Sequence, residues 1–425
     1  MSEIKTSKLK KNIWRLVLIT IAGSMIYGLP YFRSYYYDAY LEAYNLTNTQ
    51  MGMFGTMFGI FGMISYLFGG VVADMISPRK LMSISLVLTG LGGLLHLMHP
   101  SYGMLLFIYI LWGFTSLFAF WPSLLKALRQ LAGPDEQSKA TGFMDGGRGI
   151  VNAIHLAVTL AIFNYFSKKA SELAGLNGVI IFYSAVVILL GILLFFLMKE
   201  ETQLEKAQKF NFKEVISVLK LPAVWILSLV LCCTYTMNIM FYYFTPYSTS
   251  VLGVAATGAA MVTMLAQYIR PLGCFTGGIA ADRLGRSKVM YCTFTVMAIC
   301  TAILAFAGGM SVPLFVVLCV VIYFAMYAGY SLVFSMLPEG GVPEKAAGTA
   351  IGLVCTLGYL PEVFCPVVTG KVLDTLGDAG YKPLFIGIMV IMIIGIGSLI
   401  LWDNYIKRLK AKKAEAPVIE ESAEA

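Results

Sequence analysis

Apolar segments long enough to cross a membrane, about twenty residues each, recur along the whole chain and constrain its fold more than any other feature. Inside a bilayer every backbone polar group must be hydrogen-bonded internally, which favours helices. Hydrophobic residues make up 58% of the 425 residues and charged residues 13%, a composition typical of membrane proteins. We therefore predict an all-α membrane protein. The twelve expected spans are 14–33, 49–73, 81–98, 103–125, 142–166, 178–198, 222–248, 256–281, 289–308, 312–337, 347–369 and 384–402.

A charged segment in the middle of the chain divides these spans into two groups of six. We expect a cytoplasmic N-terminus at 1–13, a six-helix bundle at 14–198, a cytoplasmic linker at 199–221, a second six-helix bundle at 222–405 and a charged cytoplasmic tail at 406–425. The apolar run behind the basic N-terminus is too long for a signal-peptide core and lacks a small-residue cleavage site. It is therefore expected to remain as the first span.

Lysine and arginine residues are concentrated in every second loop. Their main clusters lie at 5–15, 79–80, 129–139, 283–288 and 407–413, and the intervening loops contain few. Loops that stay in the cytoplasm are enriched in these residues. Because the number of spans is even, we expect both termini in the cytoplasm, in a multi-pass protein of a bacterial plasma (inner) membrane.

One motif occurs twice, in corresponding loops of the two halves. The run Gly-Val-Val-Ala-Asp at 70–74, followed by Pro-Arg-Lys at 78–80, recurs at 278–288 as Gly-Ile-Ala-Ala-Asp-Arg-Leu-Gly-Arg-Ser-Lys. A weaker match at the same offset relates 134–142 to 343–348. Repeats of this kind are typical of transporters built from duplicated halves, so we expect two pseudo-symmetric six-helix bundles.

These residues resemble the signature of the major facilitator superfamily in the loop after helix 2, where a glycine is followed after three residues by Asp, Arg, any residue, Gly and basic residues. The second copy fits closely, whereas the first has Met75, Ser77 and Pro78 in place of Arg, Gly and Arg. The resemblance implies transport by alternating access, with a cytoplasmic gate at these turns. The implied gate residues are Gly70, Asp74, Arg79, Gly278, Asp282, Arg283, Gly285 and Arg286.

A second resemblance, carried by Ser77-Pro78-Arg79 and Trp121-Pro122, is to organophosphate:phosphate antiporters and related sugar-acid and organic-anion permeases. That family binds phosphate with arginines on helices 1 and 7. Here the corresponding positions are Tyr31 and Asn238. This departure leaves the substrate open.

Charged side chains deep inside a span are costly and need a partner, water or a substrate. Arg270 is expected near the midplane, because it precedes Asp282 by about twelve residues at 1.5 Å each. We predict that it contacts an anionic substrate, with Gln267 nearby; a structural ion pair with a carboxylate on a neighbouring helix is the alternative. Arg33 lies near the outer boundary and suits either a substrate contact or an anchor at the headgroups.

Two other titratable groups are candidates for coupling transport to an ion gradient. Glu362 lies between Pro361 and Pro366, where a broken helix admits water or ions. His155 has an ordinary pKa close to working pH, although a packing role is the alternative. Asp145 and Arg148 share a helix face at i and i+3, and we interpret them as a local salt bridge.

Aromatic and polar side chains repeat at helical spacing on the helices that the resemblance places around a central cavity. A tyrosine combines a flat apolar face with a hydroxyl, which suits a ligand with hydroxyl groups and CH faces. Helix packing is the alternative for each stripe. The predicted substrate contacts in these stripes are Tyr27, Tyr31, Trp121, Tyr235, Asn238, Tyr242, Tyr323 and Tyr327.

Other classes of function find no support in the sequence. The eight cysteines lie in apolar segments without metal-ligand spacing, no nucleotide-binding loop or nucleophile elbow occurs, and the basic residues form no nucleic-acid patch. We predict a monomeric secondary transporter, not an enzyme, without cofactor or metal. It would move a small, anionic, hydroxylated organic solute (sugar acid, organic acid or phosphate ester), with a proton or sodium ion as a possible coupling ion. Alternatives are a carrier of neutral sugars or polyols, a carrier of a small inorganic anion, and a transporter-like sensor.

Overall fold

The computed structural model describes residues 8–133, 136–198, 212–343 and 346–415, and within these ranges all regular structure is helical. The elements of the first half are α1 (Lys8–Lys11), α2 (Ile13–Met25), α3 (Gly28–Tyr35), α4 (Tyr37–Tyr44), α5 (Asn48–Met75), α6 (Pro78–His96), α7 (Tyr102–Trp112), η1 (Gly113–Phe120), α8 (Trp121–Leu131), α9 (Gln137–Lys169) and α10 (Glu172–Leu197). Those of the second half are α11 (Phe212–Leu219), α12 (Pro222–Met240), η3 (Phe241–Tyr243), α13 (Phe244–Ser250), α14 (Ala256–Leu284), α15 (Arg286–Phe306), α16 (Val312–Tyr330), η4 (Val333–Gly340), α17 (Ala347–Gly358), α18 (Pro361–Leu376), η6 (Gly377–Gly380) and α19 (Tyr381–Glu415).

Each of the twelve expected spans coincides with one helix or with a series of helical segments. Five spans are interrupted: α2 with α3, α7 with η1 and α8, α12 with η3 and α13, α16 with η4, and α17 with α18. By length and hydropathy alone, the described residues contain seven membrane-spanning candidates, or eight when α2 and α3, bent by 43°, count as one span. The last of the seven, Gly348–Lys412, includes α17, α18 and α19. The helices α5, α6 and α14 occupy the remaining positions.

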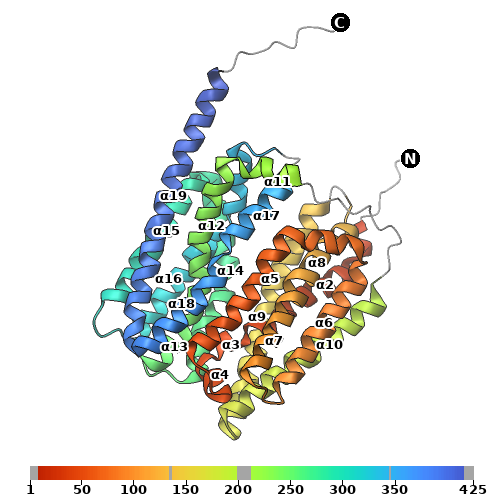
Figure 1. Ribbon diagram of the computed structural model, residues 1–425, viewed down its shortest axis with the longest axis vertical. Helices are drawn as coiled ribbons and strands as arrows, with labels where there is room; N and C mark the ends of the chain where they lie inside the picture. The colour runs from red at the N-terminus through yellow and green to blue at the C-terminus, as the bar shows by residue number, and fades with distance from the viewer. Residues whose placement is uncertain (1–7, 134–135, 199–211, 344–345, 416–425) are drawn as a thin grey trace.

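The helices form two groups that correspond to the two halves of the chain, the red-to-yellow and the green-to-blue ribbons of Figure 1. In the first half α6 packs against α10 and α2 against α9; in the second α15 packs against α19 and α14 against α16. Between the halves, α5 contacts α17 and α18, and α9 contacts α14. The second span therefore meets the eleventh and the fifth meets the eighth, as a two-fold relation between the halves requires. This confirms the predicted fold class.

One end of the interface between the halves, called here the sealed end, is closed by close helix contact. A Cβ atom on Gly52 of α5 would lie 2.3 Å from the Pro366 carbonyl oxygen of α18. The Asp374 carboxylate of α18 accepts hydrogen bonds from the backbone N–H groups of Asn48 and Thr49, each at 2.8 Å, and so caps the start of α5. Backbone-to-backbone contact and capping together join the two halves there.

The domain boundaries stay a prediction. The expected linker at 199–221 lies mostly outside the described residues, but α11 falls within it. The expected tail at 406–425 begins as helix, because α19 continues to Glu415. Its helical residues 407–415 are mostly Lys, Leu, Arg and Ala, which have high helix propensity.

Candidate substrate-binding cavity

A cavity of about 1130 Å³ lies between the two halves. Its walls come from α2, α3, α8 and α9 of the first half and from α12, α14, α16 and α17 of the second. Its lining extends from Lys8, Arg129 and Gly348, at the end opposite the sealed one, to Tyr35 and Tyr242 in the depth of the molecule. The end that carries the first three residues is called the open end.

Nine of the eleven predicted substrate contacts line this cavity: Tyr27, Tyr31, Trp121, Tyr235, Asn238, Tyr242, Gln267, Arg270 and Tyr327. The other two, Arg33 and Tyr323, lie elsewhere. Tyr323 is fully buried in the second half, with its ring centroid 5.5 Å from that of Phe241. Arg33 borders a separate void of about 30 Å³. The substrate-binding role of all eleven stays a prediction.

Arg270 enters the cavity from α14, one residue before Pro271. Its guanidinium carbon lies 5.5 Å from the ring centroid of Tyr327, a cation–π geometry. Among the residues that the structure describes, no carboxylate oxygen lies within 4.0 Å of it. The alternative of a structural ion pair therefore receives no support in this conformation. Gln267, one turn earlier, lines the same wall, and its buried amide oxygen has no hydrogen-bond partner among the described atoms.

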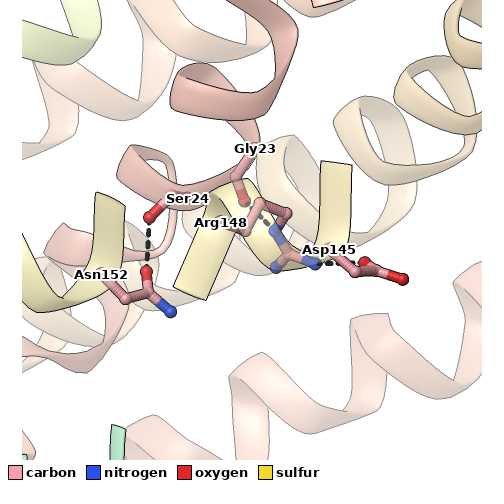
Figure 2. Close-up of polar contacts among 5 residues, drawn as sticks. All are labelled: Gly23, Ser24, Asp145, Arg148 and Asn152. Atoms are coloured by element: carbon pink, nitrogen blue, oxygen red, sulfur yellow. Dashed lines mark hydrogen bonds and ion pairs between the residues drawn. The ribbon is translucent and has the colours of Figure 1, made fainter. Parts of the chain in front are cut away.

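Arg148 forms the predicted salt bridge with Asp145, and it also lines the cavity, a position that the sequence interpretation did not assign to it. Its Nη1 lies 3.8 Å from an Asp145 oxygen, but the Asp145 side chain is 60% exposed, so this is a weak surface pair. The closer contacts are with α2 and α8: Nε donates to the Gly23 carbonyl oxygen at 3.0 Å, and the guanidinium carbon lies 4.7 Å from the Trp121 ring centroid. Figure 2 shows Arg148 held between Gly23 and Asp145. The signal available in the sequence was its spacing to Asn152 and His155 on one helix face.

A hydrogen-bonded chain continues along the same wall from Arg148. The Asn152 side-chain oxygen accepts from the Ser24 hydroxyl, as Figure 2 shows, and from His155 Nε2 at 3.1 Å. His155 Nδ1 then accepts from the Tyr183 hydroxyl at 2.9 Å, which fixes the neutral tautomer with its proton on Nε2. Because the Asn152 oxygen is occupied, its amide NH₂ is the group left to the cavity. The coupling role predicted for His155 stays a prediction.

Glu362, the other predicted coupling residue, does not line the large cavity. It faces the void of about 30 Å³ that Arg33 also borders. The hydroxyls of Tyr31 and Tyr235, which do line the cavity, both donate to its carboxylate. A carboxylate without direct contact with the cavity is thus connected to it through two phenols.

The predicted gate residues lie around the ends of α5 and α14 that face away from the sealed end. Gly285 has φ of +93°, a backbone conformation that favours glycine and that starts the turn into α15. Arg79 donates to the Met198 carbonyl oxygen at 3.4 Å, and Arg286 pairs with Glu339. Both contacts stay within one half. The side chain of Asp74 lies outside the described part, and the gate formed by Gly70, Asp74, Arg79, Gly278, Asp282, Arg283, Gly285 and Arg286 stays a prediction.

In the described ranges no three His, Cys, Asp or Glu side chains gather as metal ligands would. All eight cysteines are free thiols, and five of them are buried. The cavity therefore offers charge, hydrogen-bond donors and aromatic faces.

Comparison with known proteins gives matches over nearly the whole chain. The model of the Major Facilitator Superfamily matches residues 16–366. The inner membrane protein YihN of Escherichia coli (strain K12) is 30% identical over 422 residues, 96% of this chain and 98% of that protein. The inner membrane protein YqcE of the same organism is 31% identical over 379 residues, 86% of this chain and 88% of that protein. Among solved structures, an inward-facing, occupied bacterial homologue of the human lysosomal transporter Spinster superposes with a TM-score of 0.76 at 13% identity, covering 93% of this chain and 97% of that chain.

Proposed function

Because the chain belongs to the Major Facilitator Superfamily, we propose that it is a secondary transporter of a small, hydroxylated organic anion, such as a sugar acid, an organic acid or a phosphate ester. The single observation that carries this proposal is the pair of guanidinium groups, Arg148 and Arg270, which face one cavity from opposite halves. Two like charges in a shared cavity of low dielectric repel each other unless an anion lies between them. A bound anion would therefore connect the two halves that rock in alternating access.

The other walls of the cavity suit the remainder of such a solute. Tyr27, Tyr31, Tyr242 and Tyr327 present aromatic faces and hydroxyls, and Asn152 presents an amide donor. A carrier restricted to a small inorganic anion would need none of the aromatic wall. A carrier of neutral sugars would need neither arginine, and a charged side chain inside a span costs stability.

We place the protein in a bacterial inner membrane, as a monomer, with both termini in the cytoplasm. The similarity to two inner membrane proteins of Escherichia coli supports this membrane, and the lysines and arginines around the open end support the orientation. The conformation is then inward-facing, because the cavity reaches Lys8, Lys126 and Arg129 and the opposite end is sealed.

A ligand screen tests this proposal. The purified protein in detergent is heated with D-gluconate, glucose 6-phosphate, succinate, nitrate or D-glucose, and the shift of its melting temperature is recorded. Ligands that bind the folded state raise this temperature. We expect shifts with gluconate or glucose 6-phosphate that are absent from the Arg270→Ala variant. A shift with glucose alone, or equal shifts in both proteins, would contradict an anion site at Arg270.

A further inference from the structure

The carboxylate of Glu362 connects the two halves of the molecule near the sealed end. Tyr31 of α3 donates to Oε1 at 2.6 Å and Tyr235 of α12 donates to Oε2 at 2.8 Å. Tyr31 belongs to the first half, whereas Tyr235 and Glu362 belong to the second. The bond from Tyr31 is therefore one of the contacts that must change when the halves rock, and the bond from Tyr235 is not.

Glu362 carries no ion pair in the described ranges, where no lysine or arginine nitrogen lies within 4.0 Å of its oxygens. It is only 9% exposed. The cationic group that borders the same void is Arg33, which donates to the Met51 carbonyl oxygen at 3.3 Å and whose Nε has no partner among the described atoms. The titratable and charged groups that interact with the Glu362 carboxylate are Tyr27, Tyr31 and Arg33 from the first span, Tyr66 from α5, Tyr235 from α12, Tyr242 from η3 and Tyr330 from α16.

Glu362 has the large cavity on one side, behind two tyrosines, and a small void on the other side. The hydroxyls of Tyr31 and Tyr235 separate it from the large cavity and hence from the open end. The void on its other side is bordered by Arg33, Tyr37 and Tyr243, which lie toward the sealed end. A void of about 30 Å³ has room for a water molecule. The carboxyl group thus lies between the large cavity and a small void whose lining reaches toward the sealed end.

We infer that Glu362 is the binding site of a co-transported proton, an inference that rests on the proposed carrier function. In the conformation described, the carboxyl O–H passes its proton to a tyrosine oxygen while that tyrosine passes its own proton to water in the large cavity. The products are a hydronium ion, an unchanged tyrosine and the Glu362 carboxylate. After the sealed end opens, the carboxylate takes one proton from a hydronium ion that arrives through the void and leaves water behind.

The two protonation states differ in how firmly they hold the halves together. An ionised carboxylate accepts from both tyrosines, and hydrogen bonds to a charged group are about twice as strong as those between neutral groups. Protonation removes this charge assistance, and with it part of the strength of the Tyr31 contact across the halves. A protonated Glu362 therefore favours opening of the sealed end, and a deprotonated one favours the conformation described here.

Distance measurement between two spin labels tests this inference without any solute. Labels are attached through Glu42→Cys of α4 and Val251→Cys, which follows α13, after the eight native cysteines are replaced. Both sites are exposed, and α4 contacts α13 at the sealed end. Lowering the pH from about 9 to about 5 is expected to raise the ratio of long to short distances on the order of tenfold. Glu362→Gln should give a high ratio at every pH, because glutamine cannot ionise.

Two tyrosine variants and one variant of a surface carboxylate test whether the pH response of the distances is specific to Glu362. Tyr31→Phe should raise the ratio at high pH, because it removes the bond that crosses the halves. Tyr235→Phe should raise it less, since that bond lies within one half. Asp378→Asn, at an exposed site in η6, should respond to pH as the parent does. A pH response that persists in Glu362→Gln, or a parent protein that does not respond, would overturn the inference. Failure of the anion proposal would leave these distances unaffected, because no solute is present.

Discussion

The guanidinium groups of Arg148 and Arg270 enter one cavity from opposite halves of the molecule, Arg148 from α9 and Arg270 from α14. The helices that carry them contact each other along the interface between the halves. Arg148 is held by the Gly23 carbonyl group and the Trp121 ring, whereas Arg270 packs against the Tyr327 ring and forms no hydrogen bond or ion pair with the residues that the structure describes. Arg270 is thus the freer of the two to follow a ligand.

Replacing Arg270 should remove anion transport while the protein still inserts into the membrane. A hydrogen bond to a charged group contributes about 1.5–3 kcal/mol, so Arg270→Ala should weaken the apparent affinity for gluconate or glucose 6-phosphate by roughly ten- to a hundredfold. Arg270→Lys should recover part of this, because it keeps the charge but not the planar fork. Uptake into proteoliposomes measures both. Arg408→Ala, at an exposed site of α19, is the matched control; unchanged uptake by Arg270→Ala would exclude the assigned role.

Arg148 and its neighbour Asp145 should behave differently from each other. If their salt bridge were the main role of Arg148, the two residues would be equally sensitive to substitution. The exposed position of Asp145 and the separation of 3.8 Å instead predict that Asp145→Asn changes stability by less than about 1 kcal/mol and leaves uptake intact. Arg148→Ala should reduce uptake as strongly as Arg270→Ala. Thermal unfolding and uptake, measured on both variants, compare the two roles, and equal losses would show that the salt bridge is the main role of Arg148.

The sequence predicted the fold because the features that determine it are long and repeated. Twelve apolar runs specified twelve helical regions, and the motif copies at 70–80 and 278–288 specified the duplication. Nine of the eleven predicted substrate contacts line the cavity, because side chains at helical spacing share one face of a helix. Arg33 and Tyr323 were misplaced relative to the cavity, since the depth and rotation of a residue depend on how α3 and α16 pack. The predicted ion pair of Arg148 with Asp145 is present, but spacing alone did not show that Arg148 also faces the cavity, which depends on how α9 packs.

Because α5 and α18 are in close backbone contact at the sealed end, a single methyl group added at Gly52 should lower stability or open that end. In Gly52→Ala the new Cβ atom would lie 2.3 Å from the Pro366 carbonyl oxygen, so α5 and α18 must separate there. The variant should lose about 1–3 kcal/mol of stability in the sealed conformation or open the sealed end. Gly387→Ala of α19, where nothing lies within 4 Å, should be neutral. Thermal unfolding measures the loss of stability, and the distance between spin labels at positions 42 and 251 measures opening of the sealed end. A variant with the melting temperature and the label distance of the parent would show that the helices do not touch at Gly52.

Asn152 should determine the preference for hydroxylated over plain organic acids. It follows Arg148 by one helical turn, a spacing that places the two Cβ atoms roughly 5–6 Å apart. A carboxylate on Arg148 would then hold its neighbouring hydroxyl group against the Asn152 amide, whose oxygen is already engaged by Ser24 and His155. Asn152→Leu should therefore weaken gluconate binding by about 1–2 kcal/mol and leave binding of hexanoate, which lacks hydroxyls, nearly unchanged. Competition of each acid against gluconate uptake gives the ratio of affinities, and Asn404→Leu on the exposed part of α19 controls for the substitution itself. If the ratio stayed constant in Asn152→Leu, the hydroxyl contact would have to lie on another wall of the cavity, with the tyrosines of α3 and α16 as the next residues to replace.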